Sequence, residues 1–182
     1  MSLADIVAQY AAAQVPPARG RAVYGIVDTT FAVCRQGPRA VDQLNKHGVP
    51  SDRIAWRTVP GFKDLGVAAR QLIDAGCDIV IACGMAGPEE IDKQCAQDAS
   101  LGLQMCQQAT GVPVLEVIIH MDEADGQALI DVVDNRVREH ATNAFWMMEH
   151  PGELTQRSGT GQRQGFEDIG SIENGEGEAK DS

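Results

Sequence analysis

The stretch "CDIVIACG", residues 77–84, decides the fold of this sequence. It is a continuous apolar run of strand length, with Ile79, Val80 and Ile81 at its centre. Gly76 precedes the run, and Gly84 is its last residue. A run without polar alternation is typical of a strand that is covered on both faces, as the strands of parallel sheets are. The sequence therefore predicts an α/β domain built around this strand.

Strands and helices alternate outward from this run in both directions. Further strands are predicted at 21–28, 53–59 and 112–120. Helices are predicted from Pro38 to Gly48, over 64–75, over about 89–109, and along an apolar stripe at 129–148 that His150-Pro151-Gly152 ends. Four strands separated by helices imply right-handed crossovers and an open four-stranded parallel sheet with helices on both faces.

Composition divides the chain into one domain and two ends. The 182 residues are 43% hydrophobic, which suffices for one core. Residues 1–20 are predicted to form an amphipathic extension and linker, because Leu3, Ile6, Val7 and Tyr10 recur at helical spacing. We expect residues 21–170 to form a single α/β domain, and the Gly- and Glu-rich residues 171–182 to form a disordered acidic tail.

Charge and cysteine content limit the partners and the compartment. The net charge of −11 does not suit a protein that binds nucleic-acid phosphates. No stretch approaches the roughly twenty apolar residues of a membrane span, and the first residues lack the basic start of a secretory signal. The five cysteines contain no C-x-x-C pair, which favours a reducing compartment over disulfides or zinc. A cytoplasmic protein without a nucleic-acid or membrane partner is expected.

Four loops follow the carboxyl ends of the predicted strands, where open parallel sheets bind their ligands. The loops are "DTTF" (28–31), "PGFKD" (60–64), "GMAGPEEIDK" (84–93) and "HMDEA" (120–124). Phe31 and Phe62 are two of only four phenylalanines. The topology directs both toward one mouth, where a flat aromatic ligand would have stacking partners.

Each loop also has a simpler explanation. Asp28 suffices as a helix cap, Gly84 as part of a tight turn, and His120 as a solvated residue at a strand end. The segment "GTGQRQG" (159–165) lacks the spacing and the preceding strand of a dinucleotide-binding loop. The residues alone thus indicate an α/β domain with a polar and aromatic site, and they leave its ligand open.

Six segments, in order along about 150 residues, carry a family resemblance. They are "GIVDTTFA" (25–32), "RTVPGFKDLGVA" (57–68), "GCDIVIACGMAG" (76–87), "DKQCAQDASLGL" (92–103), "EVIIHMDEA" (116–124) and "RQGFEDIG" (163–170). They resemble the archaeal-type riboflavin synthases, relatives of lumazine synthase. The resemblance implies a lumazine synthase-like, flavodoxin-like fold, and a homopentamer with sites between neighbouring subunits. The implied activity is that of a transferase, which dismutates two 6,7-dimethyl-8-ribityllumazine molecules to riboflavin and 5-amino-6-(D-ribitylamino)uracil.

The resemblance also gives the polar and aromatic residues expected roles. Phe31 and Phe62 would cover ring faces, while loop backbone and side chains would hold a ribityl chain or a pteridine edge. The residues expected to bind substrate are Thr30, Phe31, Pro60, Gly61, Phe62, Asp64, Gly84, Met85 and Lys93. Those expected to handle protons are His120, Asp98 and Lys63.

No organic cofactor is implied, because the 7-methyl group of the lumazine is itself acidic and the enzyme need only hold two rings in contact. A dependence on Mg²⁺ stays open, although no metal-ligand cluster appears and Asp122 and Glu123 fit a helix start. Two alternatives remain. A lumazine synthase is disfavoured because the loop 84–93 has no His. A non-catalytic flavin- or pteridine-binding paralogue stays open because Val33-Cys34-Arg35 departs from the Arg-Val-Asp stretch usual in the family.

Overall fold

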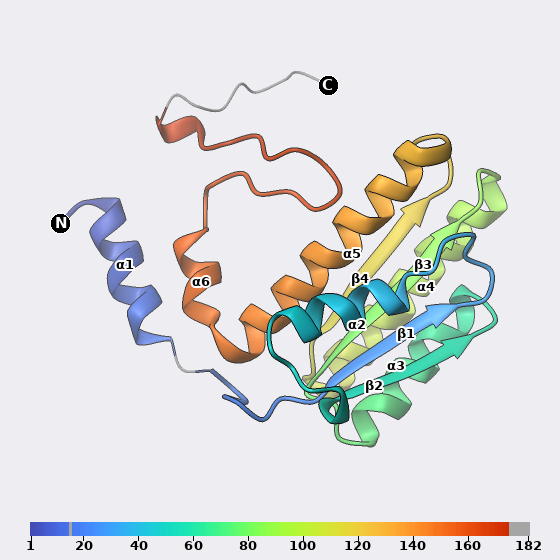
Figure 1. Cartoon of the computed structure of the whole chain (residues 1–182), viewed down its shortest axis with the longest axis horizontal. Coiled ribbons are helices and arrows are strands. Elements are labelled where there is room, and N and C mark those ends of the chain that lie inside the picture. The colour runs from blue at the N-terminus through green and yellow to red at the C-terminus, as the bar shows by residue number, and fades with distance from the viewer. Residues whose placement is uncertain (15, 175–182) are drawn as a thin grey trace.

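The computed structural model describes residues 1–14 and 16–174 and contains one parallel sheet (Figure 1). Its strands are β1 (Tyr24–Thr29), β2 (Ile54–Val59), β3 (Ile79–Ala86) and β4 (Val114–His120), in the spatial order β2-β1-β3-β4. All three neighbouring pairs run parallel. The open four-stranded α/β sheet predicted from the apolar run is confirmed.

Helices cover both faces of this sheet. One face carries α2 (Gly37–Lys46) and α5 (Gly126–Glu149), and the other carries α3 (Leu65–Asp74) and α4 (Glu90–Thr110) (Figure 1). Every residue of β1 and β3 is buried. Neighbouring strand residues alternate between two apolar cores, as the pleat of a strand requires. Ile26 and Ile81 pack toward α2 and α5, whereas Val27 and Val80 pack toward α3 and α4.

β3 begins and ends two residues later than predicted. Before its start, Asp78 forms two hydrogen bonds with Val23. The Asp78 backbone N–H donates to the Val23 carbonyl, and the Asp78 carboxylate accepts from the Val23 N–H. At its end, Gly84, Met85 and Ala86 continue the ladder because β4 offers partners as far as His120. The length of β3 is therefore set by its neighbours in the sheet.

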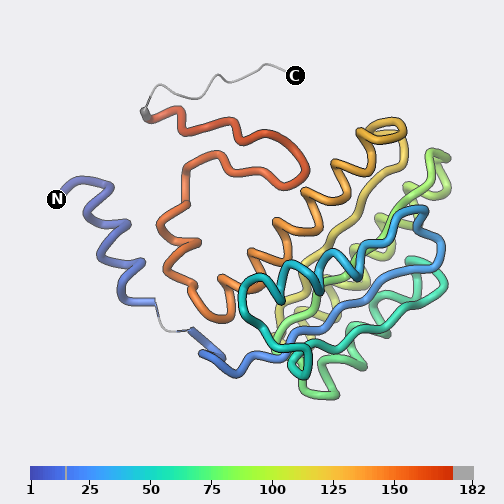
Figure 2. The backbone as a smooth tube through the Cα atoms, in the orientation of Figure 1, coloured from blue at the N-terminus to red at the C-terminus, as the bar shows by residue number. Residues whose placement is uncertain are grey.

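The N-terminal extension forms α1 (Leu3–Ala13), as its apolar spacing predicted. Ser2 and Asp5 close a reciprocal capping box at its start. The helix lies against α6 (Pro151–Gln156), apart from the sheet, as the tube in Figure 2 also shows. A side chain at Gly152 would collide with the Ala11 carbonyl oxygen, so this glycine permits the close approach of the two helices.

Two features at the C-terminal end differ from a plain helix stop. His150 leaves the helical conformation and ends α5 as predicted, but α6 begins at once, with Pro151 in its first turn. Within the predicted tail, Ile172–Asn174 form one 3-10 turn, and residues 175–182 lie outside the described residues. None of the helices that the structure describes is long and apolar enough to cross a membrane.

Candidate functional site

A cavity of about 370 Å³ lies beside the ends of β1 and β2, where the topology predicted a site. Its volume is within the usual range of small-molecule pockets. Six of the residues that line it were predicted from the sequence, and two more come from the first turns of α4. The eight are Phe31, Pro60, Gly61, Phe62, Lys63, Asp64, Asp92 and Cys95.

Thr30 holds the two loops of this cavity together. Its backbone N–H donates to the Val59 carbonyl at 2.9 Å, and its hydroxyl donates to the Pro60 carbonyl at 3.2 Å. The bonds fix the start of the first loop against the second. Phe31, the next residue, lines the cavity and is half exposed, so part of its ring is accessible to a ligand.

Phe62 also lines the cavity and is only 8% exposed. It opens a short 3-10 turn, Phe62–Asp64, that precedes α3. A side chain at Gly84 would collide with the Phe62 ring. Gly84 was expected to let a ligand approach, but in this structure the aromatic wall fills that space. The Met85 side chain is fully buried in the core beneath α2 and α5, so it does not line the cavity.

Asp28 lies behind the first loop and is buried. Its carboxylate accepts from the Gly37 N–H at 3.2 Å, the Trp56 indole at 2.9 Å and the Thr58 hydroxyl at 2.6 Å. The first of these bonds caps α2, and the other two tie β2 to β1. The simpler explanation of Asp28, a helix cap, is the one that the structure supports.

Two of the remaining predicted polar residues, Lys93 and His120, lie elsewhere, around the turn between β4 and α5. Lys93 of α4 pairs with Asp122 at 2.7 Å. This contact raises the pKa of Lys93 and lowers the pKa of Asp122. The His120 N–H donates to Glu123 at 2.7 Å, and the imidazole Nδ1 of His120 is buried without a hydrogen-bond partner. We call residues 120–124 the His120 turn.

Arg136 of α5 fixes the His120 turn from the other side. Its guanidinium donates to both carboxylate oxygens of Glu123, at 2.8 and 2.5 Å, and to the Ile118 carbonyl at 3.1 Å. Burial works to raise the pKa of Glu123, but the bonds from Arg136 and from the His120 N–H outweigh it and hold that pKa below its ordinary value. Glu123 is thus a fixed anion.

Within one chain the two groups of predicted residues do not meet. The aromatic cavity lies at β1 and β2, whereas His120 ends the opposite edge strand, β4. The start of α4 joins the two regions, since Asp92 lines the cavity and the neighbouring Lys93 pairs with Asp122. Asp98 lies further along α4 on its exposed face.

Sequence reasoning missed a titratable group on β4. Glu116 is a half-buried carboxyl in the middle of that strand, and burial raises its pKa even though a hydrogen bond with Ser100 acts in the opposite direction. Perturbed carboxyl groups of this kind are candidates for proton transfer. The available signal was one acidic residue inside the apolar run "VPVLEVIIH".

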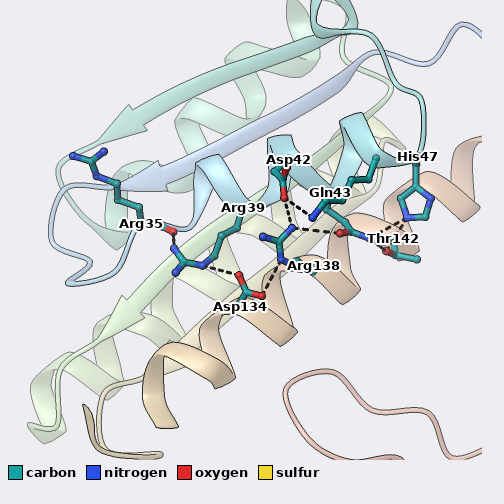
Figure 3. A network of polar contacts seen from close by, with 9 residues as sticks. Arg35, Arg39, Asp42, Gln43, His47, Asp134, Arg138 and Thr142 are labelled. Atoms are coloured by element: carbon teal, nitrogen blue, oxygen red, sulfur yellow. Dashed lines mark hydrogen bonds and ion pairs between the residues drawn. The ribbon is translucent and has the colours of Figure 1, made fainter. Parts of the chain in front are cut away.

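A network of polar contacts fastens α2, which follows the first loop, to α5 (Figure 3). Arg39 binds Asp134 at 3.0 Å and also donates to the Arg35 carbonyl. Arg138 binds Asp134 at 2.9 Å and Asp42 at 2.5 Å. The bonds connect the loop that carries Phe31 to the longest helix of the described chain, so they brace one wall of the cavity.

In its fold class this is an α/β protein, with a candidate small-molecule cavity at the carboxyl ends of its strands. In residues 1–14 and 16–174, no group of three or more His, Cys, Asp or Glu side chains is arranged to hold a metal ion. A family model described as 6,7-dimethyl-8-ribityllumazine synthase matches residues 21–151. The chain belongs to this family.

Comparison with individual relatives shows which members of the family the chain is similar to. The chain is 47% identical over 150 residues to riboflavin synthase of Methanothermobacter marburgensis, and 48% identical over 150 residues to riboflavin synthase of Methanothermobacter thermautotrophicus. Each match covers 81% of this chain and 97% of the relative. A 6,7-dimethyl-8-ribityllumazine synthase of Halorhodospira halophila is 35% identical over 78 residues, covering 41% of this chain and 50% of the relative.

Proposed function

We propose that the protein is a riboflavin synthase, a transferase that converts two 6,7-dimethyl-8-ribityllumazine molecules to riboflavin and 5-amino-6-(D-ribitylamino)uracil. The observation that carries the proposal is the cavity that is lined by Phe31 and by residues 60–64, so that two aromatic rings and polar groups share one site. A fused ring with a polyhydroxyl side chain needs this combination. The near full-length relatives named riboflavin synthase support the same activity.

In this proposal the two rings and the polar loop divide the work. Phe31 and Phe62 cover ring faces, and Pro60, Gly61 and Asp64 hold the ribityl chain or a pteridine edge. Lys63, which is exposed at the cavity, assists a proton transfer. The protein contributes mainly by holding the reactants in contact, because that removes much of the entropic barrier.

We further propose that the working form is a homopentamer with sites between neighbouring subunits. Two observations support this arrangement. Phe31 is 51% exposed at the open side of the cavity, and the polar residues His120, Lys93 and Asp98 lie apart from the cavity of their own chain. A neighbouring subunit would bring its polar residues to this aromatic wall.

The proposed setting is the cytoplasm, with no nucleic-acid or membrane partner. Five free cysteines and an acidic surface suit a reducing compartment and a small-molecule substrate. No organic cofactor is part of the proposal, since the acidic 7-methyl group of the substrate supplies the reactive carbon.

The test is incubation of the purified protein with 6,7-dimethyl-8-ribityllumazine while riboflavin fluorescence is recorded and the particle mass is measured by sedimentation. Riboflavin is expected, from particles of about five chains. Folded pentamers that produce no riboflavin would contradict the proposed activity. Riboflavin from a particle of another size would contradict only the proposed assembly.

A lumazine synthase is the second candidate, favoured by the family description and by the Halorhodospira halophila relative. It would make the lumazine from its two precursors, so the same preparation is tested with those precursors. The third candidate, a paralogue that binds flavin without catalysis, rests on Val33-Cys34-Arg35 and predicts tight riboflavin binding with no turnover of either substrate set.

A further inference from the structure

A compact loop near the C-terminal end, residues 161–169, lies against α5 beyond the part of the chain that the family model matches. The Ile169 N–H donates to the Gly161 carbonyl at 3.1 Å and closes the loop. Inside it, Arg163 donates to the Glu167 carbonyl at 2.8 Å, and its backbone N–H donates to Asp168 at 2.9 Å. We call this segment the C-terminal loop. It has a defined shape of its own.

The C-terminal loop covers Arg136. The ring of Phe166 lies 5.2 Å from the guanidinium carbon of Arg136, within the range of a cation–π contact. The backbone of Gly165 lies so close to the same guanidinium that a side chain there would collide with it. Gly165 also has a positive φ of 84°, a conformation that favours glycine, and its N–H donates to Asn135 at 2.5 Å.

Arg136 is itself buried, and its guanidinium is bound by fixed acceptors. It is 9% exposed, and its guanidinium donates to Glu123 and to the Ile118 carbonyl. A buried guanidinium without such acceptors would be strongly destabilising. Glu123 also accepts from the His120 backbone N–H at 2.7 Å, so Arg136 contacts the same carboxylate that helps to hold the His120 backbone.

These contacts form one continuous path from Phe166 through Arg136 and Glu123 to His120. We propose that Arg136 and Phe166 are positioning residues, which orient His120 for the proton transfers of the riboflavin synthase reaction. The C-terminal loop is then part of the machinery of the site, although its residues lie apart from the cavity. This inference rests on the proposed function and on the proposed role of His120.

The unpartnered Nδ1 of His120 makes this positioning consequential. A buried imidazole nitrogen without a partner has no hydrogen bond of its own to orient the ring. The orientation must come from the backbone, which Glu123 and the pairing of Ala86 with His120 hold in place. Loosening Arg136 would therefore be felt at the imidazole.

The test compares Phe166→Leu with the control Ile172→Ala. Leu keeps apolar bulk but removes the aromatic face, whereas Ile172 is 73% exposed in the same part of the chain. Phe166→Leu is expected to lower kcat about tenfold with KM nearly unchanged, and to raise the hydrogen-exchange rate of the His120 amide measured by NMR. Ile172→Ala is expected to match the wild type in both.

A double-mutant cycle separates positioning from general loosening of the fold. If Phe166 acts through His120, Phe166→Leu causes no further loss of kcat in a His120→Gln background. An equal loss in both backgrounds, full activity of His120→Gln, or an unchanged His120 exchange rate in Phe166→Leu would each overturn the inference. A wild type that makes no riboflavin would instead refute the proposed function, and the exchange rate would then decide alone whether Phe166 holds the turn.

Discussion

Gly84 and Phe62 show how a single missing side chain shapes the cavity. The Phe62 ring occupies the space above Gly84, so an added methyl group would push the aromatic wall out of place. We expect Gly84→Ala to lower the free energy of unfolding by about 1–3 kcal/mol, as overpacking does. It should also raise KM for the lumazine about tenfold by displacing the ring. Chemical denaturation and initial rates measure the two effects.

Gly102 provides the matched control for this substitution. It lies on the exposed side of α4, and a side chain there meets open space. Gly102→Ala should therefore stabilise the protein by up to about 1 kcal/mol through helix propensity, with unchanged KM. Equal effects of the two substitutions would contradict the role assigned to the Phe62 wall.

Glu116 should make stability depend on pH in an unusual direction. Burial raises the pKa of this carboxyl above its ordinary value of 4.5, so the folded state binds the proton more tightly than the unfolded state does. The ionised group then costs stability at neutral pH, and the cost disappears as the pH falls through the folded pKa. Glu116→Gln should raise the Tm at neutral pH, and the gain should vanish below pH 4.5.

Thermal unfolding of both proteins across this range measures the difference. A Gln variant that melts lower than the wild type at neutral pH would show that the carboxylate is favourably bound, against the burial argument. Turnover of the same variant also tests whether Glu116 transfers a proton.

At the scale of elements, the ion pairs between α2 and α5 predict the opposite pH response. Bonds from Lys46 and Arg138 lower the pKa of Asp42 below its ordinary value of 3.8, and bonds from Arg138 and Arg39 outweigh burial to do the same for Asp134. Their contribution is present above pH 3.8 and is lost as the pH falls through the folded values. Replacing both by Asn should lower the Tm at neutral pH and flatten its acid dependence.

The control for these replacements is Asp131→Asn. Asp131 lies on α5, and its carboxylate accepts a hydrogen bond from Gln127 of the same helix. Its Tm profile should follow the wild type. High salt should shrink the neutral-pH loss in the double variant, because exposed charges are screened. A loss that persists unchanged into acid would show that the helices are not held by these pairs.

The elements differ in how far their sequences define them. The continuous apolar run predicted β3 because the strand is buried on both faces, and the helical spacing of the apolar residues in 1–20 predicted α1. The residue at which β3 ends was not predictable, because the pairing with β4 sets that end. Helix α6 was missed, since a Pro-Gly pair ends a helix and can also start one, and the contact with Ala11 that stabilises it comes from the other end of the chain.

The site, like the elements, was predictable only in part from the sequence. Topology alone brought Phe31 and residues 60–64 together, because parallel strands end at one edge. The same rule grouped His120 with them, although β1 and β3 lie between β2 and β4. Side-chain contacts across distant segments, such as Phe62 on Gly84 or Phe166 on Arg136, leave no local pattern to find.

For the whole molecule, the proposed chemistry predicts independence from metal ions. The substrate supplies its own acidic carbon, so the protein needs to align rings and move protons. Riboflavin formation should therefore persist after dialysis against EDTA, with the rate compared before and after. Activity that EDTA removes and Mg²⁺ restores would establish a metal requirement.

Cys95 gives the molecule an internal reporter of occupancy. It lines the cavity, whereas burial raises the pKa of the Cys77 and Cys83 thiols and makes them slow nucleophiles. Alkylation of Cys95 by iodoacetamide, followed by peptide mass mapping, should slow when a flavin fills the cavity. Labelling of Cys106 on the same helix should stay constant. The extent of Cys95 alkylation would thus measure ligand binding directly, without an assay of turnover.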